Sequence, residues 1–336
     1  MVSIRDIAQE CGVSVATVSK ALNGHNDISE QTREKVRAKA AELGYQPNSV
    51  ARALKTNRTY NLGVLFEDPQ HSGLGHEYFS QILESFRAQA EAHGYDVTFI
   101  NRNIGGKNST YLEHCRYRGV DGVCAVSVNF SDLQVFELVQ SDLSSVTIDH
   151  AFNNRTAVLS DNVKGMETLV NYVFGMGHRK IAFIHGERTA VTESRCGGFY
   201  KTCGELGLEI PDIYVREAAY HNCDLCESIT EELLALPERP TCILMPDDVS
   251  ALGGIKAIVR AGLHIPEDIS ITGYDGIPLA QHLIPSLTTY HQNAQELGRW
   301  AAEKLIERIE HPKITLPENV FVHGHLMEGA SVRRIK

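Results

Sequence analysis

From residue 61 to the C-terminus, the sequence alternates short, continuously apolar runs with amphipathic stretches. Continuous apolar runs are typical of parallel strands that helices cover on both faces. The predicted strands are 61–66, 96–101, 120–126 and 145–149 in a first series, and 180–185, 241–245 and 269–273 in a second. The predicted helices include 77–93, 162–176, 192–207, 248–261 and 294–309. Two such series are together too long for one compact sheet, so the pattern predicts an α/β body of two lobes with a cleft between them.

The first 23 residues follow a different pattern, that of two short helices joined by a tight turn. Apolar residues recur at helical spacing from Ile4 to Cys11, Gly12 can end this helix, and Ser14 can cap the next one. The apolar face of the second helix consists of Val18, Ala21 and Leu22. Its other face carries Val15, Ala16, Ser19 and Lys20. Small and basic side chains suit a helix that enters the major groove of DNA, although an ordinary amphipathic surface helix has the same two faces.

A third helix and a conditional fourth follow. Residues 28–43 read as a helix with Ser29 as its cap. Pro47 then blocks continuation, and residues 49–54 can form only a very short helix that ends on an exposed leucine, Leu54. Helices shorter than about 12–15 residues are marginal in water on their own. We therefore expect this segment to become helical only when a partner orders it.

Three N-terminal helices followed by such a fourth resemble the lac repressor family of bacterial regulators. The body resembles the same family through short phrases that recur there in the same order: L-S-D-N at 159–162, G-H-R-K-I-A-F-I at 177–184, R-C-G-G-F at 195–199, D-D-V-S-A-L-G at 247–253, G-L-H-I-P-E-D-I-S-I-T-G-Y-D at 262–275 and P-S-L-T-T at 285–289. Because the resemblance runs nearly end to end, it implies the family's fold. That fold is an all-α helix-turn-helix head and a two-lobed α/β core like that of periplasmic binding proteins, with two parallel sheets flanked by helices.

The resemblance also implies a function. It predicts a cytoplasmic, homodimeric transcription repressor whose affinity for a pseudo-palindromic DNA operator is set by a small effector bound between the lobes. We expect this effector to be a carbohydrate. We also expect no enzymatic activity, no cofactor and no metal. In the family, the last long helix and a late strand cross back between the lobes. The expected domains are 1–46 (DNA-binding head), 47–60 (hinge helix and linker), 61–160 with 292–320 (first lobe) and 161–291 with 321–336 (second lobe).

The residues expected to contact DNA fall into three groups. Base edges in the major groove would be reached by Val15, Ala16, Ser19 and Lys20. Phosphate contacts that position the head would come from Ser14, Thr17 and Asn23. The hinge residues expected in the minor groove are Val50, Ala51, Leu54 and Lys55. The resemblance implies that Leu54 wedges into the operator's central step, and Lys20 should prefer a guanine, because its ammonium suits the O6 and N7 acceptors.

An effector between the lobes needs polar groups that converge on the cleft. Arg195 offers a five-donor fork suited to vicinal hydroxyls or a carboxylate. Asp275, just beyond a predicted strand, and Asp149 both lie where open α/β sheets bind ligands. Tyr220 and Tyr78 could stack on the apolar face of a sugar. Taken alone, these residues could equally be a surface arginine, helix-capping aspartates and core tyrosines, but the family matches at R-x-x-G-F and G-Y-D favour a ligand role for Arg195 and Asp275.

One departure from the family affects the choice of ligand. Asp247-Asp248 stands where Asn-Asp is common. We expect Asp247 to be a further effector-binding residue. An extra carboxylate in the cleft favours a hydroxyl-rich or cationic ligand over an anionic one.

The distribution of charge agrees with a molecule of two parts. The whole chain is acidic, with a net charge of −10. Residues 1–60 nevertheless hold nine Lys or Arg against six Asp or Glu, which leaves 23 against 36 for the remainder. A mildly basic head on an acidic body suits a DNA reader that avoids non-specific adhesion.

Other classes of protein have less support. The N-terminus lacks the apolar segment of a signal peptide, and no stretch approaches the roughly 18–20 apolar residues of a membrane span. Gly73-Leu-Gly75 lacks the third glycine of a dinucleotide-binding fingerprint. Of the eight cysteines, Cys223 and Cys226 form the one cluster, without the further ligands that a zinc site needs. The alternative is a solute-binding protein with no regulatory role, which would share the body but not the head.

Overall fold

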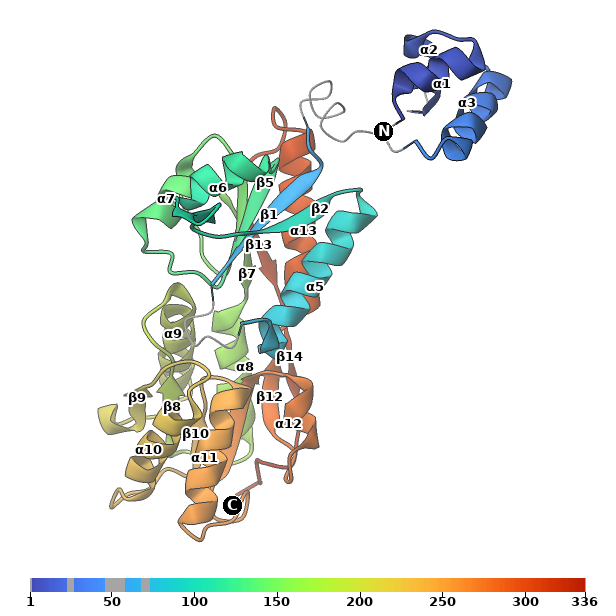
Figure 1. Ribbon diagram of the computed structural model, residues 1–336. Coiled ribbons are helices and arrows are strands. Elements are labelled where there is room, and N and C mark those ends of the chain that lie inside the picture. Colours follow the sequence, from blue (N-terminus) through green and yellow to red (C-terminus); the bar gives the residue numbers. More distant parts are fainter. Residues whose placement is uncertain (1, 23–26, 46–57, 68–72, 336) are drawn as a thin grey trace. The chain divides into compact units, whose positions relative to one another are not determined.

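The computed structural model describes residues 2–22, 27–45, 58–67 and 73–335. They belong to two compact units, Met1–Thr59 and Tyr60–Lys336 (Figure 1). The short helix expected at 49–54 lies outside the described residues.

The first unit contains three helices: α1 (Ile4–Cys11), α2 (Val15–Leu22) and α3 (Glu30–Glu42). The Ser3 amide donates to the Asp6 carboxylate at 2.7 Å, which caps α1. Gly12 ends that helix in the left-handed conformation, at φ 67°. The three helices share a core of Ile7, Ala8, Cys11, Val18, Ala21, Val36 and Ala40. Because Ser29 stays outside α3 and accepts the Thr32 amide, this helix begins two residues later than predicted.

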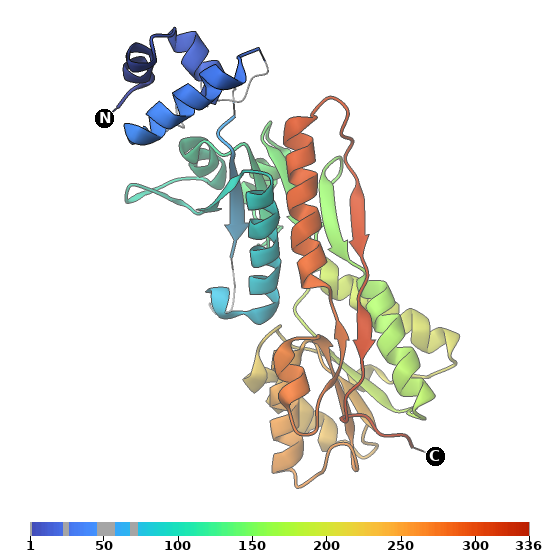
Figure 2. The same cartoon turned by 90° about the vertical axis from the view of Figure 1, so that its right-hand side faces the viewer.

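The first lobe of the second unit is a six-stranded parallel sheet with the order β13-β7-β6-β5-β1-β2. Its strands are β1 (Asn61–Phe66), β2 (Asp96–Ile100), β5 (Gly122–Val126), β6 (Ser144–Ile148), β7 (Thr156–Ser160) and β13 (Asn319–Val322). Helices α5 (Glu77–Ala92) and α13 (Ala294–Glu310) pack side by side on one face, as Figure 2 shows. Helices α6 (Tyr111–Arg118) and α7 (Leu133–Gln140) cover the other face. The buried strands carry Val, Ile, Leu, Ala and Cys toward both helical layers, which is why their sequences read as continuous apolar runs.

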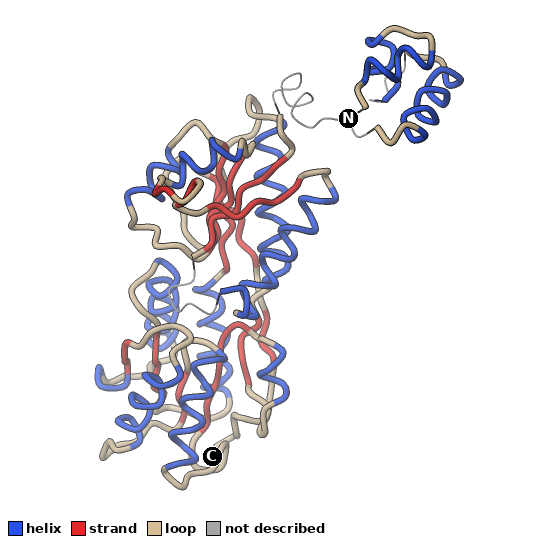
Figure 3. The backbone as a smooth tube through the Cα atoms, in the orientation of Figure 1, coloured by secondary structure: helices blue, strands red, loops and turns tan. Residues whose placement is uncertain are grey.

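The second lobe repeats this architecture, with the order β14-β12-β11-β10-β8-β9. Its strands are β8 (Ile181–His185), β9 (Val215–Glu217), β10 (Cys242–Leu244), β11 (Ser270–Asp275), β12 (Thr288–His291) and β14 (His325–Met327). All are parallel except β14, which pairs antiparallel with β12. One face is covered by α8 (Asn162–Gly175) and α9 (Ala190–Glu205). The other is covered by α10 (Cys223–Leu234), α11 (Asp248–Arg260) and α12 (Pro278–His282). Figure 3 shows each sheet between its helices.

Three segments connect the lobes: β7 to α8, β12 to α13, and β13 to β14. The expected boundary at residue 320 lies inside β13, which stays paired with β7 as far as Val322. Several short elements carry no strong sequence signal: η1 (Gly73–Gly75), η2 (Asp212–Tyr214) and the hairpin of β3 (Asn103–Ile104) and β4 (Lys107–Asn108). Among the described residues, no helix has both the length and the apolar character needed to cross a membrane.

The cysteine cluster of the sequence lies in the first turn of α10. The Cys223 thiol donates to the Val249 carbonyl at 3.1 Å, and Cys226 is buried in the core of the second lobe. Within the described residues, no group of three or more His, Cys, Asp or Glu side chains is placed to hold a metal ion. Cys223 and Cys226 both contribute to the contacts between α10 and the rest of the lobe.

Candidate functional sites

Helix α2 presents the predicted DNA-contacting residues on its outer face. Val18 and Ala21 are buried, whereas Val15, Ala16 and Lys20 are exposed. Ser14 precedes the helix as its cap and accepts the Thr17 amide at 3.1 Å. Ser19 and Thr17 are half-buried at the edges of the exposed face.

The remaining predicted DNA contacts cannot be placed. They lie outside the described residues: Asn23, Val50, Ala51, Leu54 and Lys55. They stay predictions from the sequence.

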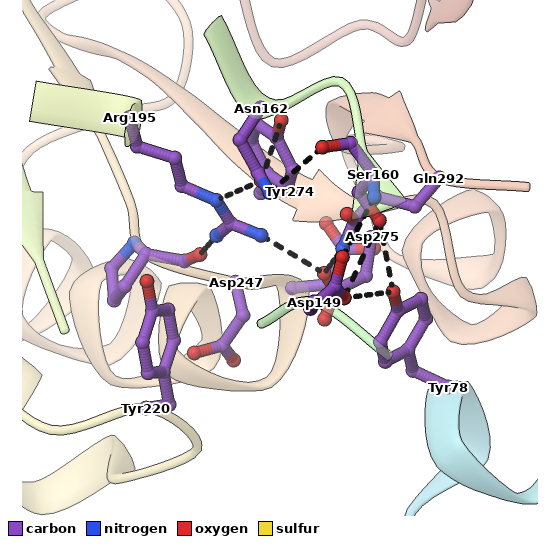
Figure 4. Close-up of polar contacts among 12 residues, drawn as sticks. Tyr78, Asp149, Ser160, Asn162, Arg195, Tyr220, Asp247, Tyr274, Asp275 and Gln292 are labelled. Carbon is purple, nitrogen blue, oxygen red and sulfur yellow. Dashed lines mark hydrogen bonds and ion pairs between the residues drawn. The ribbon is translucent and has the colours of Figure 1, made fainter. Parts of the chain in front are cut away.

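Arg195 lies on the inward face of α9, between the buried residues Thr192 and Phe199. Its Nε donates to the Asn162 carboxamide and one terminal nitrogen to the Pro246 carbonyl, both at 2.8 Å. The guanidinium carbon lies 3.6 Å from the centre of the Tyr274 ring. The other terminal nitrogen is 4.0 Å from the Asp275 carboxylate, so one end of the fork is fixed and the other faces the cleft (Figure 4).

Asp275 is the last residue of β11, because this strand extends two residues further than the predicted end at 273. Its φ of 101° is unusual for a residue with a side chain. The carboxylate accepts the Gln292 amide at 2.7 Å. Burial outweighs the attraction of Arg195 and raises the pKa of Asp275 from 3.8 to about 6.

Asp149 brings a second carboxylate to the cleft from the first lobe. It follows β6 and also has a positive φ, 58°. One oxygen accepts the Ser160 amide at 2.7 Å, and the other lies 3.4 Å from the Tyr78 hydroxyl of α5. Burial, together with the charges of Asp149 and Asp275, raises the pKa of Tyr78 well above its usual value. The tyrosine is therefore a neutral donor in a site where the two lobes meet (Figure 4).

Tyr220 lies beside Arg195 in the second lobe, 5.4 Å from ring centre to guanidinium carbon. Its hydroxyl is 2.9 Å from the Thr192 hydroxyl, and its amide donates to Glu187 at 2.8 Å. A Cβ at Gly186 would come within 2.3 Å of the ring, so only glycine leaves room for it. The ring is thus held in one orientation at the edge of the site.

Asp247 is placed differently from the other predicted residues. It caps α11, and its two oxygens accept the Ser250 amide and hydroxyl, both at 2.7 Å. It also accepts the His221 amide at 2.9 Å and pairs with the His221 ring at 3.2 Å. Burial acts to raise the pKa of Asp247, but the charge and hydrogen bonds of His221 hold it at about 2. These contacts fix His221 and the start of α11, and a role for Asp247 in binding the effector stays a prediction.

Sequence reasoning missed several residues of this site. Asn162 and Tyr274 hold Arg195, and both stand inside the family phrases that the sequence displays. Gln292, which holds Asp275, had no such signal. His76 of the first lobe meets His221 of the second, with 3.8 Å between ring centres, although the two lie far apart in sequence.

A cavity of about 500 Å³ opens at this end of the cleft. Its lining residues include His76, His221, Asp275, Ile277 and Leu279. This volume lies within the usual range of small-molecule sites, about 300–1,000 Å³.

The chain matches two known protein families. Residues 3–48 match "Bacterial regulatory proteins, lacI family", and residues 170–332 match "Periplasmic binding protein-like domain". The HTH-type transcriptional repressor PurR of Mannheimia succiniciproducens is 32% identical to it, with 100% of both proteins covered. The chain belongs to the lacI family of bacterial regulatory proteins. PurR of Haemophilus influenzae is 34% identical over 93% of this lacI-family chain and 92% of that repressor.

Solved structures agree with this assignment to the lacI family. The lac repressor dimer bound to operator and the anti-inducer ONPF matches with a TM-score of 0.82 and 25% identity, over 99% of each chain. The complex of the regulator CelR with cellobiose shares the fold, with a TM-score of 0.72 and 24% identity over 98% of this chain and 100% of that one. The protein is therefore a DNA-binding transcriptional regulator with a ligand-binding core, and the alternative of a solute-binding protein without a regulatory role is set aside.

Proposed function

We propose that this protein is a homodimeric, cytoplasmic repressor whose affinity for a pseudo-palindromic operator changes when a carbohydrate binds between its lobes. The observation that carries the proposal is the convergence of Arg195 and Asp275 from one lobe with Asp149 and Tyr78 from the other. A ligand that contacts both pairs fixes the angle between the lobes. Ligand binding can alter DNA affinity only through such a difference between two states.

The chemistry of these side chains favours a sugar. Each sugar hydroxyl can donate to a carboxylate and accept from a guanidinium or a tyrosine hydroxyl. Two carboxylates, Asp149 and Asp275, face the cleft near a single arginine, so an anionic ligand would meet repulsion. The Tyr220 ring offers a flat surface of the kind that packs on the apolar face of a sugar ring. Because the Asp247 carboxylate is engaged by His221, the preference rests on Asp149 and Asp275 rather than on the extra carboxylate.

In the head, we assign base reading to the outer face of α2. Val15 and Ala16 can offer only apolar contact, such as with a thymine methyl, whereas Lys20 suits a guanine. Ser14, Thr17 and Asn23 would position the head on phosphates. A dimer presents two heads, so the operator should contain two half-sites in inverted orientation. Leu54, with Val50, Ala51 and Lys55, would act between them in the minor groove.

A panel of sugars screened by thermal unfolding tests the effector assignment. A sugar at about 100 times its Kd should stabilise the protein by roughly 2.7 kcal/mol. The same sugar should then change operator affinity measured by fluorescence anisotropy. Stabilisation only by anionic ligands, or by a sugar that leaves DNA affinity unchanged, would contradict the proposal.

A further inference from the structure

Lys20, the basic residue of α2, is already engaged within the head. Its ammonium lies 2.5 Å from the carboxylate of Asp27, in the segment that leads into α3. The two side chains are 46% and 55% exposed, so solvent or DNA can reach both partners. The pair neutralises the one charged side chain that α2 presents on its outer face.

We infer that Asp27 sets how selectively the head reads DNA, by holding Lys20 on the protein until a base edge takes its ammonium. This inference rests on the proposed entry of α2 into the major groove. On non-operator DNA, Lys20 stays with Asp27, and the head forgoes one contact to a phosphate. On the operator, a guanine offers two acceptors in one place and displaces the carboxylate.

The energies involved suit such an exchange. An ion pair between exposed side chains is weak and shifts the equilibrium between the paired and the released lysine only about two- to fivefold. The Lys20–Asp27 pair therefore cannot prevent a good contact between Lys20 and a base. It can still decide whether Lys20 stays with Asp27 or moves to a phosphate, because those two contacts are of similar strength. A lysine released from Asp27 gains a phosphate contact on any DNA, and each such contact steepens the salt dependence of binding by about 0.9 in the log–log slope.

The test compares Asp27→Asn with Glu42→Gln in the full-length protein. Glu42 pairs with Lys39 on α3 at 2.7 Å, so the control removes the same charge and releases a lysine that α2 does not carry. The DNA probes are an operator selected from random duplexes by the wild-type protein and the same duplex with shuffled half-sites. Asp27→Asn should tighten binding to the shuffled duplex about two- to fivefold. It should also steepen the log–log slope of that binding against salt concentration by about one for each head. The ratio of operator affinity to shuffled-duplex affinity should fall. Glu42→Gln should leave that ratio unchanged.

Repeating Asp27→Asn in a Lys20→Ala background separates a restraint on Lys20 from a general negative charge. If Asp27 acts through Lys20, the substitution no longer changes the ratio of affinities in that background. If the ratio still falls there, or if Glu42→Gln lowers it equally, the inference is wrong while the proposed function stands. If selection yields no operator at all, the proposed function is wrong, and the inference falls with it.

Discussion

Replacing Asp275 with asparagine should stabilise the protein at neutral pH while it damages the effector site. The folded pKa of Asp275 is about 6 against a reference of 3.8, because burial outweighs Arg195. At about 1.4 kcal/mol per pKa unit, keeping this group ionised in the folded state costs about 3 kcal/mol. Asparagine removes the charge and can still accept from Gln292, so Asp275→Asn should gain most of that amount at pH 7.5.

The pH dependence follows from the sign of the shift. Between about pH 4 and pH 6, folded Asp275 keeps a proton that the unfolded chain has lost. The neutral carboxyl of Asp275 therefore imposes no penalty on the folded state below about pH 4. Stability is lost as the pH rises through 6, because the buried carboxyl must then ionise. The difference in unfolding free energy between Asp275→Asn and wild type should be near zero at pH 4 and largest above pH 7.

Asp247→Asn is the matched control, because it should change the unfolding free energy at neutral pH in the opposite direction. The pKa of Asp247 is held at about 2, so its ionised form stabilises the fold by about 2 kcal/mol at neutral pH. That stabilisation is present above pH 4 and is lost as the pH falls through 2. Urea unfolding at pH 4.5 and 7.5 measures both variants. The reasoning is refuted if Asp275→Asn is no more stable than wild type at pH 7.5, or if Asp247→Asn is not less stable.

Two further substitutions test the DNA-reading helix and the aromatic wall separately. Lys20→Ala should cost roughly 1–3 kcal/mol of operator binding and relax base preference at one symmetric pair of positions; a uniform loss on every sequence, seen in a binding-site selection, would make Lys20 a phosphate contact instead. Gly186→Ala should displace the Tyr220 ring, because the new Cβ would lie 2.3 Å from it. Calorimetry should then show weaker effector binding with operator affinity unchanged, whereas wild-type effector affinity would show that Tyr220 does not contact the ligand.

Much of the fold was predictable because it depends on local pattern. The apolar runs became parallel strands, and the helix predicted at 162–176 is α8, Asn162–Gly175. The sequence also singled out Arg195 and Asp275, because both stand in phrases shared with the family, and the fold brings their side chains within 4.0 Å of each other. The prediction that α2 has one buried and one exposed face is confirmed.

The rest depends on contacts between residues distant in sequence. His76 and His221 meet only because two lobes fold around one cleft, and no spacing in the sequence indicates the pair. The same holds for Asp247, whose partner His221 lies 26 residues away on another segment. Nothing in the sequence indicates that the Asp247 carboxylate accepts hydrogen bonds from His221 and Ser250. The short hairpin of β3 and β4 has too few residues for a pattern to show.

The central claim is that a ligand held by both lobes controls DNA binding. Operator affinity of wild type and Arg195→Ala, each with and without a sugar that stabilises the wild type, tests it most directly. Arg195→Ala removes one of the two donors to the Asn162 side-chain oxygen and the side-chain donor to the Pro246 carbonyl, so its folded state is first verified by its unfolding transition. We expect operator affinity near wild type without sugar and no response to sugar. A folded Arg195→Ala protein that responds normally to the sugar, or that fails to bind operator in its absence, would contradict the account.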